Sequence, residues 1–238
     1  MYNLETIMST TPPRSRSQLD RELMLLRDNV LRLSTMVDAA LQQLQQINRQ
    51  LDVAQARQII ADDTKINRLR YKIEEDAYKL IARHQPTARD LRGIITSIHI
   101  AVELERIGDY AAGNSRLLLE MVDEALLIST FSNITRMLDL SRQMMRNAMN
   151  AYVHWDEEQA RRVIQRDNDI DAIDKQVYQE LIDLMTKQSH TISHATYMLW
   201  ISHNCERIGD RITNICERII YMVSGEMYYG IRQKGEEL

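Results

Sequence analysis

Apolar residues recur at intervals of three and four along most of the chain, which is the spacing of one face of an α-helix. The pattern is clearest near the N-terminus, where it continues without a break for about seven helical turns. We therefore predict one long helix in this region. Its apolar stripe consists of Leu19, Leu23, Leu26, Val30, Leu33, Val37, Leu41 and Leu44.

Five more helices are expected after the first. Pro86 separates the second from the third, because the residue before a proline leaves helical geometry whereas proline itself suits the first turn of a new helix. Residues 1–17 contain Pro12 and Pro13 among scattered polar residues, and we expect them to form a disordered lead. The later helices are predicted at about 54–84, 86–124, 129–155, 157–187 and 190–223.

The second set of three helices repeats the first. The letters LERIGD at residues 104–109 recur as CERIGD at residues 205–210, each late in the third helix of its half. A period of about 100 residues made of three helices implies two similar three-helix bundles. We therefore predict an all-α fold of two tandem, pseudo-symmetric three-helix bundles, at residues 18–126 and 127–225, followed by a tail at 226–238.

The composition supports long helices and excludes some classes of function. The chain has 7 Gly and 3 Pro, and its 44% hydrophobic residues are mainly strong helix formers. A net charge of -4, with no basic patch interleaved with aromatic residues, argues against nucleic-acid binding. Because no apolar run reaches the roughly 18 residues of a membrane span and the N-terminus lacks a secretory signal, we expect a cytoplasmic protein.

Two cysteines occur in the predicted sixth helix. Cys205 and Cys216 are separated by eleven positions, or about 16 Å along a helix, which is too far for a disulfide bond. We expect both to be reduced residues of the hydrophobic core.

Each LERIGD-like repeat contains the motif Glu-x-x-x-Asp, which we call ExxxD. In the third helix Glu105 and Asp109 lie one turn apart and continue an apolar arc. Burying a carboxylate is costly unless a cation or a basic side chain compensates its charge. Glycine inside a helix is less favourable than Ala by about 1 kcal/mol, so its presence in each motif suggests a close helix contact there. The apolar arc consists of Leu91, Ile94, Ile95, Ile98 and Val102.

The second half carries more carboxylates than the first. On the sixth helix Glu206, Asp210 and Glu217 share one side, and on the fifth helix Asp167 and Asp174 lie on the facing stripe. Oxygen ligands from two neighbouring helices suit a divalent or trivalent cation such as iron, manganese, zinc or magnesium. A fifth-helix neighbour, Asp171, lies at the edge of that stripe.

The first half has a smaller set of candidate ligands, namely Asp63, Glu105 and Asp109. Arg70 and Arg116 stand where the second half has Asp174 and Glu217, so we expect the second half to bind metal more tightly. The alternative is that these acids are solvated or pair with arginines of the sixth helix, but both motifs interrupt an apolar face at the same place in each half.

These motifs resemble the PhoU family, as do their flanks QPTARDLR at residues 85–92 and NICE at 214–217. The resemblance covers about residues 17–230. It implies two three-helix bundles and a cytosolic adaptor with metal ions or small metal clusters at the ExxxD motifs. In that family the adaptor works with the ATPase subunit of the phosphate importer and with a sensor histidine kinase. As a negative regulator, it holds the phosphate-starvation response off when phosphate is plentiful.

Two further expectations follow from the resemblance. We expect a homodimer that associates with the membrane only through its partners. This chain also departs from the family pattern, because Gly113 stands where the family has Asn, and with Arg116 this predicts a less complete first metal site.

Two other functions fit a carboxylate-bearing helical bundle. A ferritin-like di-metal oxidase would use Glu-x-x-His motifs, and none of the six histidines has Glu three residues before it. A purely structural interaction module would use its Met-rich and Leu-rich stripes only for packing and would not retain metal. Because the chain also lacks a phosphate-binding glycine loop and a paired nucleophile motif, we expect it not to be an enzyme.

Overall fold

The computed structural model describes residues 14–50, 52–121 and 128–228. Long helices make up most of these residues, and no strand occurs within the three ranges, so the all-α prediction is confirmed. The elements are α1 (Arg14–Gln50), α2 (Val53–His84), α3 (Ala88–Leu119), α4 (Ile128–His154), α5 (Glu157–Lys187), the short 3-10 turn η1 (Ser189–Thr191) and α6 (Ile192–Ser224).

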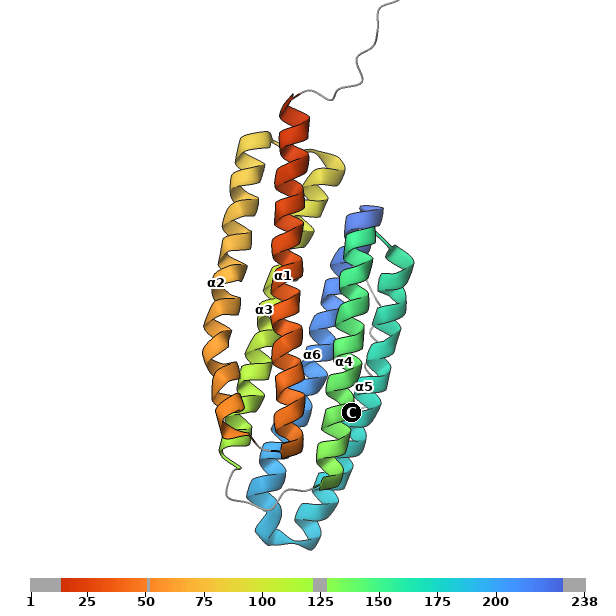
Figure 1. Cartoon of the computed structure of the whole chain (residues 1–238). Coiled ribbons are helices and arrows are strands. Elements are labelled where there is room, and N and C mark those ends of the chain that lie inside the picture. Colours follow the sequence, from red (N-terminus) through yellow and green to blue (C-terminus); the bar gives the residue numbers. More distant parts are fainter. Residues whose placement is uncertain (1–13, 51, 122–127, 229–238) are drawn as a thin grey trace, which may run out of the picture.

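The helices form two three-helix bundles side by side, α1–α3 and α4–α6 (Figure 1). Helices α3 and α6 contact each other in the middle of the molecule, and α2 and α5 lie on its two flanks. Helices α1 and α4, in front in Figure 1, also contact each other. The Thr96 hydroxyl of α3 donates to the carbonyl of Arg218, and Asn114 donates to the carbonyl of Ile201, so α3 and α6 run antiparallel.

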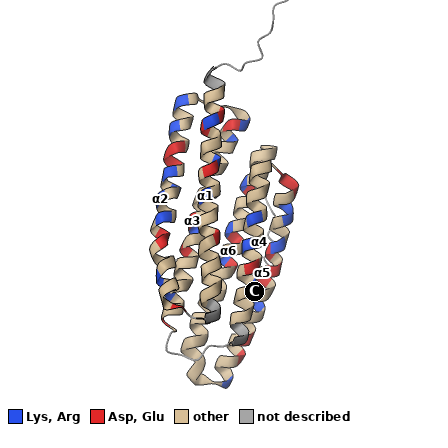
Figure 2. Cartoon of the chain, viewed as in Figure 1, with Lys and Arg blue, Asp and Glu red and all other residues tan. Residues whose placement is uncertain are grey.

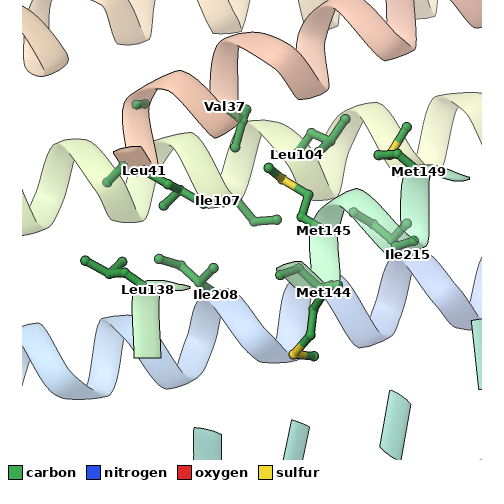
Figure 3. Packing of buried hydrophobic residues seen from close by; sticks show 14 of the residues in the cluster. Val37, Leu41, Leu104, Ile107, Leu138, Met144, Met145, Met149, Ile208 and Ile215 are labelled. Atoms are coloured by element: carbon green, nitrogen blue, oxygen red, sulfur yellow. The ribbon is translucent and has the colours of Figure 1, made fainter. Parts of the chain in front are cut away.

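One hydrophobic core runs through both bundles. Figure 3 shows side chains of α1, α3, α4 and α6 packed together, including Val37, Leu104, Met145 and Ile208, all of which are almost fully buried. Flexible methionine side chains of α4 fill the space between the two halves. The two bundles therefore share a core instead of each enclosing a separate one.

Three helix ends differ from the prediction. Helix α1 begins at Arg14, directly after Pro13, so the expected lead of residues 1–17 ends earlier than predicted. Helix α3 begins at Ala88 and not at Pro86, because Gln85 takes a left-handed conformation that closes α2 with a hydrogen bond to Ile81. Helix α3 ends at Leu119, where the Glu120 N–H bonds to carbonyls three and four residues back. The predicted end at residue 124 lies outside the described residues.

The surface carries charges of both signs. Lys and Arg alternate with Asp and Glu along the outer sides of α2 and α5 (Figure 2). Several of these residues form ion pairs one helical turn apart, such as Lys72 with Asp76 and Arg161 with Glu157. Among the described residues, none of the helices is both long enough and apolar enough to cross a lipid bilayer.

Candidate functional site

The glycine of each ExxxD motif lies where the third helix of a bundle touches the second. A Cβ atom added to Gly209 would overlap the Asp167 carboxylate and would lie 3.1 Å from Ile170. A Cβ added to Gly108 would lie 3.1 Å from Ile66 and 3.7 Å from the nearer Asp63 oxygen. The close approach predicted from the glycines is therefore confirmed, and it brings a carboxylate of α2 or α5 against each motif.

The first cluster lies between α2 and α3 and consists of Asp63, Glu105 and Asp109. Partial burial raises the pKa of all three carboxyl groups above their usual range, including that of Asp109, whose side chain still reaches solvent. The charge of Asp109 raises the pKa of Asp63 and of Glu105 further, so the three groups are close enough to repel one another. The sequence-predicted ligands of the first half are thus brought together.

Arginines compensate part of this repulsion. Arg116 lowers the pKa of Asp63 and of Asp109, and Arg70 lowers that of Glu105. The effect of burial is larger, so the pKa values stay raised. The Arg70 guanidinium also donates to Glu74 of its own helix at 2.6 Å, so its positive charge is shared with that partly buried carboxylate.

Asn67 belongs to the same cluster, although sequence analysis did not select it as a ligand. Its side-chain N–H donates to Asp63 Oδ2 at 3.3 Å. Asp63 Oδ1 and Asn67 Oδ1 are buried, and neither accepts a hydrogen bond within the described part of the chain. Asn67 stands where the second half has Asp171, and that match was the signal that could have identified it. Two buried oxygen atoms here are therefore available to a cation.

The second cluster lies between α5 and α6. Asp210 is buried, with 3% of its surface exposed, and Arg207 lies 3.6 Å from its carboxylate. Glu206 is also largely covered and lies 3.9 Å from both Arg207 and His203. The two ExxxD carboxylates of this half are thus more enclosed than Asp109, which is exposed.

The remaining acids of the second half are spread along the helices. Asp174 accepts a hydrogen bond from the Ser202 hydroxyl at 2.6 Å. Burial, together with the nearby negative charge of Asp174, raises the pKa of the Cys205 thiol to about 12. Burial also raises the pKa of the Cys216 thiol, and the negative charges of Glu217 and Asp167 contribute to this increase. Since Glu206 and Glu217 are about 16 Å apart along α6, the predicted ligands cannot all meet at one point.

The two cysteines are free and buried, as predicted. The apolar arc predicted for α3 is only partly correct, because of its five residues only Ile94 is buried. The fully buried side of α3 carries Ile100, Leu104 and Ile107 instead, because α3 packs against α1, α2 and α6 at once. The ExxxD carboxylates of α3 therefore lie on the side that faces α2, where Glu105 is partly buried and Asp109 is exposed.

A known protein family matches both bundles. The family model described as "PhoU domain" matches residues 30–126 and again residues 134–219, once in each bundle. This chain belongs to the PhoU family. Two copies of the PhoU domain thus account for the duplication seen in the sequence and in the fold.

Similar proteins cover most of the chain. It is 33% identical over 185 residues to the "phosphate-specific transport system accessory protein PhoU homolog" of Rhizobium meliloti, covering 78% of each protein. The crystal structure of the phosphate transport system regulatory protein PhoU from Streptococcus pneumoniae is similar with a TM-score of 0.83 and 30% identity, covering 89% of this chain and 99% of that one. PhoU from Pseudomonas aeruginosa gives a TM-score of 0.84 at 29% identity, covering 88% of this chain and 100% of that one.

The donor atoms of this PhoU family member suit a hard cation. All candidates are carboxylate or amide oxygens, and the glycines leave space for them beside α3 and α6. Within the described residues, however, no three His, Cys, Asp or Glu side chains already converge as a ligand set. Coordination would therefore require the carboxylates to rotate toward a common point.

Proposed function

We propose that this chain is a cytoplasmic adaptor that regulates phosphate uptake and phosphate-starvation signalling as a negative regulator and has no turnover of its own. The observation that carries the proposal is the match to the PhoU domain in both halves. Relatives are named as accessory or regulatory proteins of phosphate transport. The partners would be the importer's ATPase subunit and a sensor histidine kinase, and the adaptor, as a homodimer, would reach the membrane only through them.

Metal binding at the ExxxD clusters would support this role. In the first half Asp63, Glu105 and Asp109 would hold the ion with the amide oxygen of Asn67. In the second half Glu206, Asp210 and Asp167 would form the centre, flanked by Asp174 and Glu217. A bound divalent or trivalent cation would supply the charge that offsets repulsion among these carboxylates. Iron, manganese, zinc and magnesium all accept such oxygen donors.

The position of the clusters suggests how binding could reach a partner. Each ExxxD pair lies on α3 or α6, the two helices that contact each other at the centre of the molecule. Arg211, next to Asp210, donates to Glu103 of α3, two residues before Glu105. Ordered carboxylates would therefore hold both central helices in one arrangement and present a fixed surface for docking.

Metal analysis of untagged protein tests the first part. We expect stoichiometric metal after extensive dialysis, and Glu206→Gln with Asp210→Asn should remove the metal of the second half. The double variant should stay helical by circular dichroism, because neutral amides do not repel one another. A matched control is Glu158→Gln with Asp169→Asn, which changes two exposed α5 carboxylates and should retain all metal.

The order of the two sites is a separate prediction. Glu105→Gln with Asp109→Asn should release less metal than the α6 double variant, because Arg70 and Arg116 already supply positive charge in the first half. Metal density confined to the first-half cluster would show that this order is wrong.

Complementation tests the regulatory role. In a cell deleted for its own family member, and with matched partners, this chain should restore repression of phosphate-starvation genes at high phosphate. Failure to restore repression, or stoichiometric oxidase or phosphatase turnover by the purified protein, would reject the adaptor proposal. Oxidase turnover would favour the ferritin-like alternative, and absence of retained metal would favour the purely structural module.

A further inference from the structure

A polar cavity of about 270 Å³ lies between α4 and α5, and we call it the α4–α5 cavity. Its polar lining consists of three side-chain amides and two guanidinium groups. These belong to Gln143, Asn147, Gln159, Arg162 and Arg166. Among the described residues, no acidic one lines it, although the chain as a whole is acidic, with 34 Asp and Glu against 30 Lys and Arg.

Helix geometry places these groups opposite one another. On α4 the lining residues Gln143 and Asn147 lie one turn apart, and on α5 Arg162 and Arg166 do the same. Met144 and Val163, which are buried, form an apolar floor between the two rows. The cavity opens on the α4 side of α5, whereas Asp167 faces α6, so the cavity is distinct from the ExxxD cluster.

Both arginines can turn toward a ligand. Arg162 is 3.7 Å from Glu158, and Arg166 is 3.6 Å from Asp169, both longer than the 2.7–2.9 Å typical of a charge-assisted hydrogen bond. The two arginines and their two acidic partners are each more than half exposed, so water strongly screens both ion pairs. An anion that accepts two hydrogen bonds from each guanidinium would compete well with them.

We propose that the α4–α5 cavity binds the phosphate group of a small molecule through Arg162 and Arg166. Guanidinium forks match the geometry of phosphate oxygens, and amide N–H groups of Gln143, Asn147 and Gln159 supply further donors. This site goes beyond the proposed regulatory function and does not depend on it, because its residues contribute to neither metal cluster.

The ligand could be free inorganic phosphate or the phosphate group of a larger compound. The cavity is larger than one phosphate ion, and its apolar floor of Met144 and Val163 offers contact to an organic part such as a nucleoside. The two sources share the phosphate chemistry, and direct binding measurements separate them.

Calorimetric titration of the full-length protein with inorganic phosphate and with adenosine monophosphate tests the site, in low salt and without divalent metal. We expect saturable binding of at least one ligand. Arg162→Gln with Arg166→Gln should weaken that binding tenfold or more, and the Lys double variant should weaken it less, because it keeps charge but loses the planar fork. Tighter binding of the nucleotide would assign the organic phosphate, and equal binding would assign the free ion.

The control is Arg146→Gln, which removes one exposed positive charge from α4 outside the cavity lining. It should leave the affinity within twofold of the unmodified protein. The proposal is overturned if neither ligand binds at millimolar concentration, or if the Arg162 and Arg166 double variant binds as the unmodified protein does. It is also overturned if Arg146→Gln weakens binding as much as the double variant.

Discussion

At the scale of single residues, Gly209 and Gly113 are two helical glycines with opposite packing environments. Both lie inside long helices, where glycine is less favourable than Ala by about 1 kcal/mol. Gly209 faces Asp167 and Ile170 closely, so there is no room for a methyl group. Around Gly113, the one atom of the described residues within 4 Å of an added Cβ is the Asn204 side-chain nitrogen, at 3.9 Å, which is ordinary van der Waals contact.

We therefore expect Gly209→Ala to lower the free energy of unfolding by about 1–3 kcal/mol through overpacking. Gly113→Ala should raise it by about 0.5–1 kcal/mol, because Ala restricts the unfolded chain and favours the helix. Urea unfolding followed by circular dichroism measures both changes. Equal effects of the two substitutions would show that contact with α5 does not decide the choice of glycine at position 209.

At the scale of elements, an aspartate starts each second helix of a bundle. Asp52 precedes α2, and its carboxylate accepts hydrogen bonds from the backbone N–H groups of Ala54 and Gln55. Asp156 precedes α5 and accepts from the N–H of Gln159 at 2.8 Å. These carboxylates satisfy N–H groups that have no partner inside the helix and also interact favourably with the helix dipole.

Replacing the cap of α5 tests this role. Asp156→Ala should lower the free energy of unfolding by about 1 kcal/mol, whereas Asp156→Asn should change it by only a few tenths, because Asn caps a helix about as well as Asp. Thermal and urea unfolding of the two variants give the comparison. If Asn were as harmful as Ala, the negative charge and not the hydrogen bond would be the main contribution.

At the scale of the whole molecule, Arg142 of α4 joins the two bundles on the α1 side. Its guanidinium donates two hydrogen bonds to the Asp38 carboxylate, at 2.9 and 3.1 Å, and further bonds to the side chains of Gln42 and Gln45. Arg142 is largely buried, with 9% of its surface exposed. Its loss would leave one carboxylate and two amide oxygens of α1 without this donor.

Arg142→Ala should therefore lower the free energy of unfolding by about 2–4 kcal/mol. The loss should be smaller than for a fully buried ion pair, because Asp38 keeps some contact with water. Asp38→Ala should cost less than the arginine change, since the two glutamines remain as acceptors. A double-mutant cycle in urea isolates the coupling between Arg142 and Asp38. Full additivity of the two substitutions would show that the pair does not hold the bundles together.

Because the core is shared, we expect the two bundles to unfold as one cooperative unit. Side chains from both halves pack against each other through α1, α3, α4 and α6, as in the contact of Met145 with the region of Leu104 and Ile107 in Figure 3. The halves are similar in sequence pattern, yet neither would bury its inner face without the other. This explains why residue spacing predicted two bundles but did not reveal that their cores are continuous.

The sequence by itself determined the number and type of the helices, the duplication and the pairing of each ExxxD motif with a carboxylate of the preceding helix. These features depend on local periodicity and on the contact that each glycine permits, and both are written in the spacing of residues. Residue type also indicated the different charge balance of the two clusters, through Arg70 and Arg116.

The tertiary structure decided which side of each helix is buried and what the polar groups contact. Helix α3 has neighbours on three sides, so its most buried residues are set by α1 and α6 and not by its own apolar arc. Asp109 is exposed whereas Asp210 is buried, although the two occupy equivalent positions. Such differences, like the α4–α5 cavity, arise from the packing of helices that are distant in sequence, and a periodic pattern along one helix does not encode that packing.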